Sequence, residues 1–246
     1  MKRIKLVVAY DGTNYCGWQI QPNGVTIEQK LNEALSGLLG VDTKVTGASR
    51  TDAGVHSLGN VCVFDTDSRM PAEKFSYALN SRLPEDIVVQ ASCEVSADFH
   101  PRFSKSQKTY EYRILNRTFR MPQRRLDTYF YYHPLDEGRM QKAADYLIGE
   151  HDFKSFCSIH SQAETTVRRI DSCTVKRDGD LVTIRITGNG FLYNMVRIIA
   201  GTLIRVGGGE LQPEQIPEIL AAKDRAAAGP TAPAHGLTMI GIEYEP

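Results

Sequence analysis

Strand-like and helix-like segments alternate along the whole chain, and this alternation limits the fold to the α+β class. Apolar side chains at every second position over residues 4–8 predict a strand. Residues 27–39 predict an amphipathic helix, with Thr26 as its amino-terminal cap and Gly40 as its stop signal. Because both kinds of element carry one apolar face, we expect helices packed on a sheet.

The first half continues with further strands and a second helix. Residues 60–65 alternate again, residues 71–79 predict a helix that starts at a proline, and residues 87–89 form a short apolar run. The order is of the β-α-β-β-α-β type, which is close to a ferredoxin-like, or RRM-like, unit.

The second half shows a related mixture of elements. Strands are expected at residues 110–114, 172–176, 181–186 and 239–244, and helices at residues 135–147, 191–203 and 213–222. Residues 178–180 (DGD) predict the turn of a hairpin between two of these strands. A polar stretch at residues 103–107 interrupts the pattern, so we expect two α+β halves, residues 1–104 and residues 105–246.

The charge of the chain is balanced in total but not along its length. The 246 residues hold 29 Lys and Arg against 29 Asp and Glu, which argues against a strongly basic, tail-driven nucleic-acid binder. Residues 100–126, however, carry eight basic residues and one acidic residue, with aromatic residues interleaved. Such a mixture is typical of RNA recognition, so we favour a polyanion-binding groove over an ordinary solvated loop and strand face.

The spacing of the cysteines and the length of the apolar runs indicate where the protein is located and whether it binds a metal. The five cysteines are widely spaced, without a CxxC pair or a histidine at metal-ligand spacing. The amino terminus has no apolar signal-peptide core, and no apolar run approaches the roughly 18 residues that cross a bilayer. We therefore expect a cytoplasmic protein with reduced thiols, no membrane segment, no metal and no small-molecule cofactor.

A loop rich in small residues carries the strongest chemical signal. Residues 47–57 lie between two predicted strands and place Arg50 two positions before Asp52. Small residues allow a ligand to approach the backbone closely, and the arginine would keep the carboxylate ionised. By spacing alone, Asp52 is more typical of a turn residue, and His56 of a hydrogen-bonded structural histidine.

The amino-acid sequence of this loop resembles a motif of a known family. Residues 49–56 (SRTDAGVH) closely resemble the active-site motif of the TruA-type tRNA pseudouridine synthases, in which the aspartate is catalytic. Six further segments resemble motifs of the same family, in the family's order: residues 15–22 (YCGWQIQP), 99–103 (FHPRF), 108–112 (KTYEY), 189–197 (NGFLYNMVR), 221–225 (AAKDR) and 231–237 (TAPAHGL). The resemblance therefore covers essentially the whole chain, from residue 4 to residue 244.

This resemblance implies a two-half fold with a central active-site cleft, and an enzyme that isomerises uridine to pseudouridine. It implies action on tRNA, at positions 38, 39 and 40 of the anticodon stem-loop, by a homodimer that needs no cofactor or metal. The implied catalytic residues are Asp52, Arg50, Tyr110 and Arg197. The implied substrate-binding residues are Tyr110, Leu237, Gln19, His56, Arg102 and Lys108.

Each implied role suits the chemistry of its side chain. Asp52 would act as a nucleophile or stabilise an oxocarbenium-like sugar, and Arg197 would pair with it and keep it charged. Tyr110 would stack on the target base and assist proton removal, whereas Arg50 would fill the space that the base leaves in the stem. Leu237 would pack near the base as a wall of the pocket.

Two other functions are compatible with parts of this pattern. A non-catalytic protein that binds structured RNA could use the same aromatic and basic residues, but binding alone does not require Arg50, Asp52, Tyr110 and Arg197 together. A glycoside or nucleoside hydrolase could use Asp52, but such enzymes usually need a second carboxylate in partnership, and nothing near these motifs supplies an obvious one.

Overall fold

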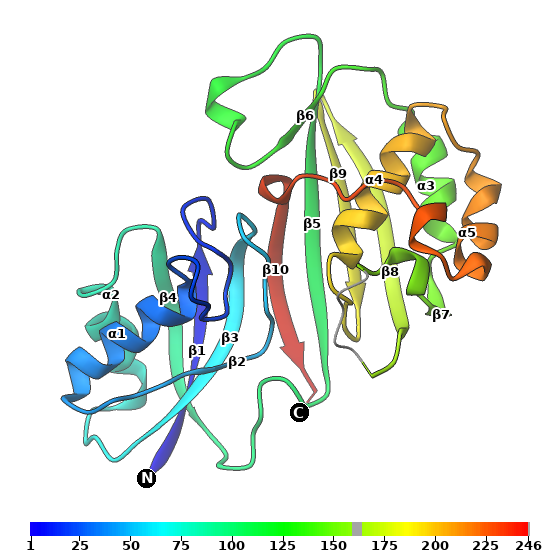
Figure 1. The fold of residues 1–246 in the computed structure, drawn as a ribbon. Coiled ribbons are helices and arrows are strands. Elements are labelled where there is room, and N and C mark those ends of the chain that lie inside the picture. Colours follow the sequence, from blue (N-terminus) through cyan, green and yellow to red (C-terminus); the bar gives the residue numbers. More distant parts are fainter. Residues whose placement is uncertain (159–163, 246) are drawn as a thin grey trace. The chain divides into compact units, whose positions relative to one another are not determined.

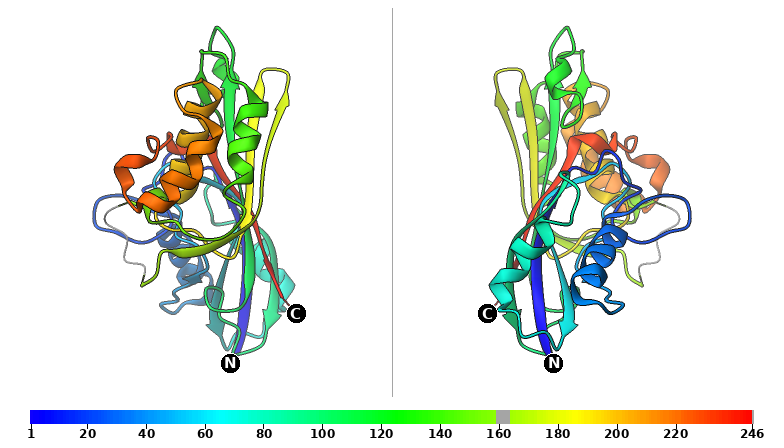
Figure 2. Two further views of the ribbon diagram at one scale, coloured as in Figure 1. Left: turned by 90° about the vertical axis from the view of Figure 1, so that its right-hand side faces the viewer. Right: turned by 90° about the vertical axis from the view of Figure 1, so that its left-hand side faces the viewer.

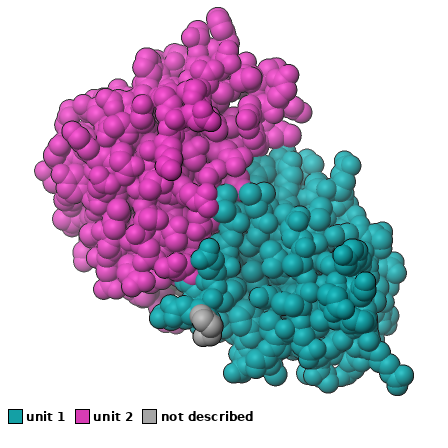
Figure 3. Space-filling view, turned by 180° about the vertical axis from the view of Figure 1, so that it is seen from behind, with its two compact units in different colours: residues 1–106, 239–246 teal, residues 107–238 magenta. Residues whose placement is uncertain are grey.

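The chain folds into two compact units, which Figure 3 shows in different colours. The first unit holds residues 1–106 together with residues 239–246, and the second holds residues 107–238. The computed structural model describes residues 1–158 and 164–245. Both units combine helices with mostly antiparallel strands, so the α+β class predicted from the sequence is confirmed.

The first unit is built on β1 (Lys2–Tyr10), which runs antiparallel to its two neighbours (Figure 1). These neighbours are β3 (His56–Thr66) and β4 (Ile87–Val95). The short β2 (Thr46–Gly47) pairs with β3, as does β10 (Leu237–Tyr244), which comes from the far end of the chain. A strand of this unit is thus supplied by residues that follow the whole second unit in the sequence.

Two helices cover this sheet with the apolar faces that the sequence predicts. In α1 (Ile27–Leu39) the Thr26 hydroxyl accepts a hydrogen bond from the Gln29 N–H at 3.3 Å, and Gly40 ends the helix with a left-handed φ of 72°. The second helix is α2 (Phe75–Asn80). The following side chains of β1, α1 and α2 are fully buried in one cluster: Ile4, Leu6, Val8, Ile27, Leu31, Leu35, Phe75 and Leu79.

The strands of the second unit follow the order β5 (Ser106–Asn116), β9 (Leu181–Gly188), β8 (Val167–Asp178) and β7 (Gly149–Asp152). Neighbours in this order run antiparallel, and β8 and β9 form the hairpin that the sequence predicts. The short β6 (Tyr129–Tyr131) lies parallel to β5. This order places β5, which carries the motif segment 108–112, beside the β8–β9 hairpin.

The helices of the second unit are α3 (Glu137–Asp145), α4 (Met195–Gly207) and α5 (Ile216–Ala222). Helix α3 packs on β8 and on α4, and Figure 2 shows these helices beside the strands from two further sides. Short 3₁₀ helices lie at Ala72–Lys74, Pro122–Arg124, Lys154–Phe156, Pro213–Gln215, Arg225–Ala227 and Ala234–Gly236. Within residues 1–158 and 164–245, no helix combines the length and the apolar character that a membrane span needs.

Helix α4 begins four residues later than its apolar spacing predicts. The spacing starts at Phe191, but the helix starts at Met195, because Asn194 takes a left-handed conformation with φ 60° and ψ 7°. Residues 191–194 therefore form an irregular entry to the helix. An apolar pattern cannot show this entry, since it records which side chains are buried and not the backbone angles.

A glycine in α4 is packed too closely for any side chain. A Cβ on Gly201 would lie 1.9 Å from the carbonyl oxygen of Pro230, and the Gly229 N–H donates to the Thr202 hydroxyl at 2.9 Å. The helix therefore touches the segment around Pro230 through its backbone.

Gly201→Ala is expected to lower the free energy of unfolding by about 1–3 kcal/mol, because the new methyl group would push helix and segment apart. Gly37 offers a matched control, since it lies in α1 and a Cβ there would meet nothing within 4 Å. Gly37→Ala is expected to raise stability by about 0.5–1 kcal/mol. Urea unfolding measures both, and an unchanged stability of Gly201→Ala would contradict the close contact.

Candidate active site

Residues 48–55 connect β2 to β3 and carry Arg50 and Asp52. The side chains of Ser49 and Thr51 are buried, whereas Arg50 is exposed and Asp52 is half-buried. Alternate burial is the mark of an extended segment whose successive side chains point to opposite faces. Arg50 and Asp52 therefore share the outer face of the loop.

The backbone on both sides of Asp52 is fastened to the segment that follows β1. The Trp18 N–H donates to the Thr51 carbonyl at 3.0 Å, and the Gly54 N–H donates to the Tyr15 carbonyl at 3.3 Å. The loop has little regular secondary structure, so its backbone polar groups bond with this segment in place of a neighbouring strand. They hold the Asp52 peptide between two fixed points.

Glycines allow these segments to approach so closely. Gly17 has a φ of 83°, and a Cβ there would lie 2.5 Å from the Thr51 carbonyl oxygen and 3.0 Å from the Asp52 carbonyl carbon. A Cβ on Gly47 would lie 2.4 Å from the indole nitrogen of Trp18. The segments 15–22 and 49–56, which are separate motifs in the sequence, are thus two parts of one packed structure.

Two buried polar side chains hold the inner face of the loop. The Tyr10 hydroxyl forms a 2.7 Å hydrogen bond with the Thr51 hydroxyl, and the Asn60 amide donates to the Ser49 carbonyl at 3.0 Å. Burial raises the pKa of Tyr10 to about 12, so its phenol stays neutral at ordinary pH. A neutral phenol and an amide can satisfy buried polar groups without placing a charge in the core.

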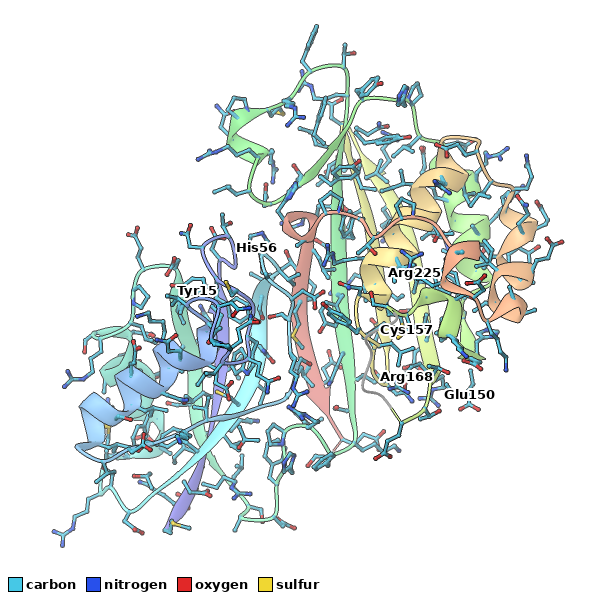
Figure 4. All side chains as sticks on the ribbon, viewed as in Figure 1. Tyr15, His56, Glu150, Cys157, Arg168 and Arg225 are labelled. Atoms are coloured by element: carbon cyan, nitrogen blue, oxygen red, sulfur yellow. The ribbon has the colours of Figure 1, made fainter. Side chains whose placement is uncertain are left out.

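His56 joins the end of the loop to the end of β1. Its Nδ1 accepts a hydrogen bond from the Gly12 N–H at 3.1 Å and lies 3.1 Å from a carboxylate oxygen of Asp11. Only 8% of His56 is exposed, and Figure 4 labels it near Tyr15, at the same end of the strands. These contacts fix the His56 ring between the end of β1 and the start of β3.

Two arginines of the first unit lie close enough to affect each other. The Arg102 guanidinium donates to the Gly47 carbonyl at 3.4 Å. Burial lowers the pKa of Arg102, and the positive charge of Arg50 adds to the effect, while Glu28 opposes it. Two neighbouring guanidinium groups repel each other unless an anion lies near them, which suits contact with a phosphate backbone. Gln19, the remaining predicted residue of this unit, is exposed.

In the second unit, Tyr110 and Lys108 lie on β5. Tyr110 is 8% exposed, and its ring meets that of Phe191 edge to face, with centroids 5.2 Å apart and planes at 83°. This packing limits rotation of the phenol ring. Lys108 lies opposite Gly188 of β9 and is half-buried.

Arg197 lies in the first turn of α4, where two of its nitrogens are held. Its Nε donates to the Ala232 carbonyl at 2.8 Å, and its Nη1 donates to the Asn194 side-chain oxygen at 2.8 Å. The Ala232 N–H in turn donates to the Arg197 carbonyl at 3.1 Å. The arginine of one motif is thus fixed by the segment that carries another.

Leu237 opens β10 and is 5% exposed. The residue before it, Gly236, is packed on Tyr112, since a Cβ there would lie 2.7 Å from the ring carbon that bears the hydroxyl. That hydroxyl donates to the Pro233 carbonyl at 2.9 Å. The position of Leu237 is therefore set by the buried ring of Tyr112.

The basic window at residues 100–126 is less positive in the fold than in the sequence. Its basic residues form ion pairs with acidic residues outside the window: Lys105 with Glu245 at 2.6 Å, Arg113 with Asp127 at 3.8 Å, Arg117 with Asp180 at 3.2 Å and Arg124 with Asp127 at 3.0 Å. Arg113 also pairs with Glu111, the acidic residue of the window, at 2.8 Å. The guanidinium carbon of Arg120 lies 5.0 Å from the centroid of the Phe130 ring. These contacts reduce the positive charge that the window offers to a polyanion.

The site residues belong to acid–base and electrostatic chemistry. In the part of the chain that the structure describes, no three His, Cys, Asp or Glu side chains converge as a metal site would require. The first unit offers the carboxylate of Asp52 and the guanidinium of Arg50, and the second offers the phenol of Tyr110 and the guanidinium of Arg197. Groups of these kinds serve acid–base and electrostatic chemistry.

Sequence reasoning missed the residues that support the loop. Tyr10 continues the inward-facing series of β1, and Asn60 is a polar residue within an apolar strand, which is the signal that could have revealed them. It also missed Ser49, whose buried hydroxyl has no hydrogen-bond partner in the structure.

Comparisons of the sequence with known proteins assign the chain to a family. The profile of a family described as "tRNA pseudouridine synthase" matches residues 6–104 and 143–245. The tRNA pseudouridine synthase A of Acetivibrio thermocellus is 47% identical over 244 residues, covering 99% of this chain and all of the relative. The enzyme of the same name from Ruminiclostridium cellulolyticum is 49% identical over 245 residues, with the same coverage.

Among solved structures, the archaeal box H/ACA sRNP Nop10-Cbf5 complex matches 96% of this chain and 46% of the other chain. Identity is 11% and the TM-score is 0.35, a similarity too low to support a conclusion. The sequence relatives instead carry the assignment, and they support an enzyme rather than a non-catalytic RNA-binding module. The chain therefore belongs to the tRNA pseudouridine synthase family and is an isomerase that converts uridine to pseudouridine.

Proposed function

We propose that this enzyme modifies positions 38, 39 and 40 of the tRNA anticodon arm, with Asp52 as its catalytic residue. The proposal is supported by the two backbone hydrogen bonds that hold the peptide on either side of Asp52. The Trp18 N–H donates to the Thr51 carbonyl, and the Gly54 N–H donates to the Tyr15 carbonyl. A reacting carboxylate gains most when its backbone is held before the substrate arrives. The anticodon arm comes from the family resemblance of the motif.

The reaction needs no oxidant, reductant or energy source. The bond between ribose C1′ and base N1 breaks, the base turns over, and a bond between C1′ and C5 forms. N1 gains a proton and C5 loses one, so atoms and electrons balance within the nucleotide. Asp52 would attack the substrate or stabilise the positive charge that develops on the sugar.

The other predicted residues would prepare and hold the nucleotide. Arg197 would keep Asp52 charged, and Tyr110 would stack on the base and accept or relay the C5 proton. Arg50 would enter the space that the flipped base vacates, because a guanidinium plane can stack on neighbouring bases. Leu237 would form a wall of the base pocket.

The remaining predicted contacts concern the RNA around that nucleotide. Arg102 would bind phosphate together with Arg50, since their mutual repulsion falls when an anion lies between them. Gln19, His56 and Lys108 are proposed as further substrate contacts. A tRNA substrate also favours a cytoplasmic location, as do the unpaired cysteines of the chain.

Asp52→Asn is expected to lower tritium release from tRNA labelled at C5 of uridine by at least about 100-fold, because an amide neither attacks nor balances a positive charge. Filter binding of tRNA should be unchanged. Asp65→Asn is the matched control, since it removes a carboxylate of the same unit whose two oxygens accept from Arg3 at 2.8 Å. Substantial tritium release by Asp52→Asn would remove Asp52 from the catalytic role.

The target positions can be mapped on unmodified tRNA incubated with the protein alone. Carbodiimide-dependent primer extension is expected to stop at uridines 38, 39 and 40, and nowhere outside the anticodon arm. Stops elsewhere would overturn the proposed positions. Release of free uracil would instead indicate a nucleoside hydrolase built on Asp52.

We also propose that the enzyme is a homodimer in which one tRNA contacts both subunits, as the family resemblance implies. Sedimentation equilibrium is expected to give twice the mass of the single chain. A second measurement is the number of tRNA molecules bound per dimer, which tests whether the dimer has two equivalent sites. A monomer that remains fully active at all concentrations would contradict the shared binding of one tRNA.

A further inference from the structure

Asn194 has an unusual backbone for a residue that precedes a helix. Its φ of 60° and ψ of 7° lie in the left-handed region, whereas most capping residues are extended. Among residues 1–158 and 164–245, only Asn194 and Lys223 combine a positive φ with a side chain. Such a conformation costs free energy, and it persists where surrounding contacts enforce it, often at functional sites.

The side chain of Asn194 does not cap the helix that it precedes. No hydrogen bond joins it to the first backbone N–H groups of α4. Its oxygen instead accepts from Arg197 Nη1 at 2.8 Å, and its nitrogen donates to the Ser158 hydroxyl at 2.8 Å. Both ends of the amide are therefore used, one on an arginine and one on a neighbouring segment.

Ser158 is itself fixed to the entry of the helix. Its N–H donates to the Tyr193 carbonyl at 3.1 Å, next to the side-chain bond from Asn194. The amide of Asn194 thus bonds with a residue whose backbone is tied to the entry of the same helix. Its oxygen then faces Arg197, one turn along the helix.

Arg197 is consequently held at two nitrogens by two different segments. The Ala232 carbonyl fixes Nε at 2.8 Å, and Asn194 fixes Nη1 at 2.8 Å. A guanidinium group is planar, so two fixed nitrogens define the orientation of the whole fork. Loss of the Asn194 oxygen would remove one of these two fixed points and so change the orientation of the fork.

We propose that Asn194 is a positioning residue that orients the guanidinium of Arg197 for the isomerisation. This inference rests on the proposed function, in which Arg197 partners Asp52. Asn194 acts through Arg197 and has no contact with the reacting atoms in the proposal. Its left-handed backbone accompanies an amide that bonds with the Arg197 side chain and not with the first backbone N–H groups of α4.

A purely structural role predicts a different response to substitution. Asparagine tolerates the left-handed region better than most residues, and glycine tolerates it better still. If the backbone alone mattered, Asn194→Gly would be as active as the wild type. If the amide matters, the glycine variant would fold normally and react slowly.

The experiment compares Asn194→Gly and Asn194→Asp in single-turnover reactions with tRNA. Asn194→Gly is expected to slow the reaction about 10- to 100-fold, because a small misplacement of a charged group is costly, while tRNA affinity and thermal midpoint stay near those of the wild type. Asn194→Asp keeps an oxygen acceptor for Arg197 and is expected to restore most of the rate. A structural role would move stability or affinity, not this rate.

A matched control removes an amide that also makes two hydrogen bonds elsewhere. Asn80 donates to the Val89 carbonyl at 3.0 Å and accepts from the Val89 N–H at 2.8 Å, at the end of α2. Asn80→Gly is expected to lower the thermal midpoint and leave the single-turnover rate unchanged. The pair of variants thus separates loss of stability from loss of orientation.

Arg197→Gln distinguishes failure of this inference from failure of the proposed function. A slow Arg197→Gln beside a wild-type rate for Asn194→Gly would overturn the positioning role and leave the role of Arg197 intact. A wild-type rate for Arg197→Gln would overturn both. Equal slowing of Asn194→Gly and Asn194→Asp would also overturn the inference, because the acceptor oxygen would then have no effect.

Discussion

The position of Asp52 depends on the bonds made to its neighbour, Thr51. The Thr51 carbonyl accepts from the Trp18 N–H, and its hydroxyl bonds with the buried phenol of Tyr10. A segment with so little regular structure would otherwise be among the first parts of a fold to open. These contacts allow the Asp52 side chain to remain half-buried, and so reachable by RNA, while its peptide is held by the core.

The long elements of both units could be predicted because each repeats its apolar residues with a clear period. Helix α1, with its Thr26 cap and Gly40 stop, and the β8–β9 hairpin are the best examples. The strands β2, β6 and β7 have two to four residues, too few for a period to show. The pairing of β10 with the first unit could not be predicted from the sequence either. An alternating pattern shows which side chains of a strand face the core, and not which strand lies beside it.

The candidate site was predictable only where residues themselves form a motif. Arg50 and Asp52 stand out in an eight-residue string, whereas Tyr10 and Asn60 are single polar residues within strands. A count of charges was misleading for a related reason. The basic window gains partners such as Asp180 and Glu245 from distant parts of the sequence, and only the fold brings them to Arg117 and Lys105.

The aspartate and the arginine are held by different kinds of group, and this decides how each responds to sequence change. Asp52 is held by backbone N–H groups, which every residue except proline supplies, so the loop tolerates many side chains at position 18 as far as this bond is concerned. Arg197 is held partly by the side chain of Asn194. Its orientation therefore responds to the identity of residue 194, in addition to the backbone carbonyl of Ala232. The side chains of Tyr10 and Asn60 bond with Thr51 and Ser49, so a change at these positions reaches Asp52 through the backbone of the loop.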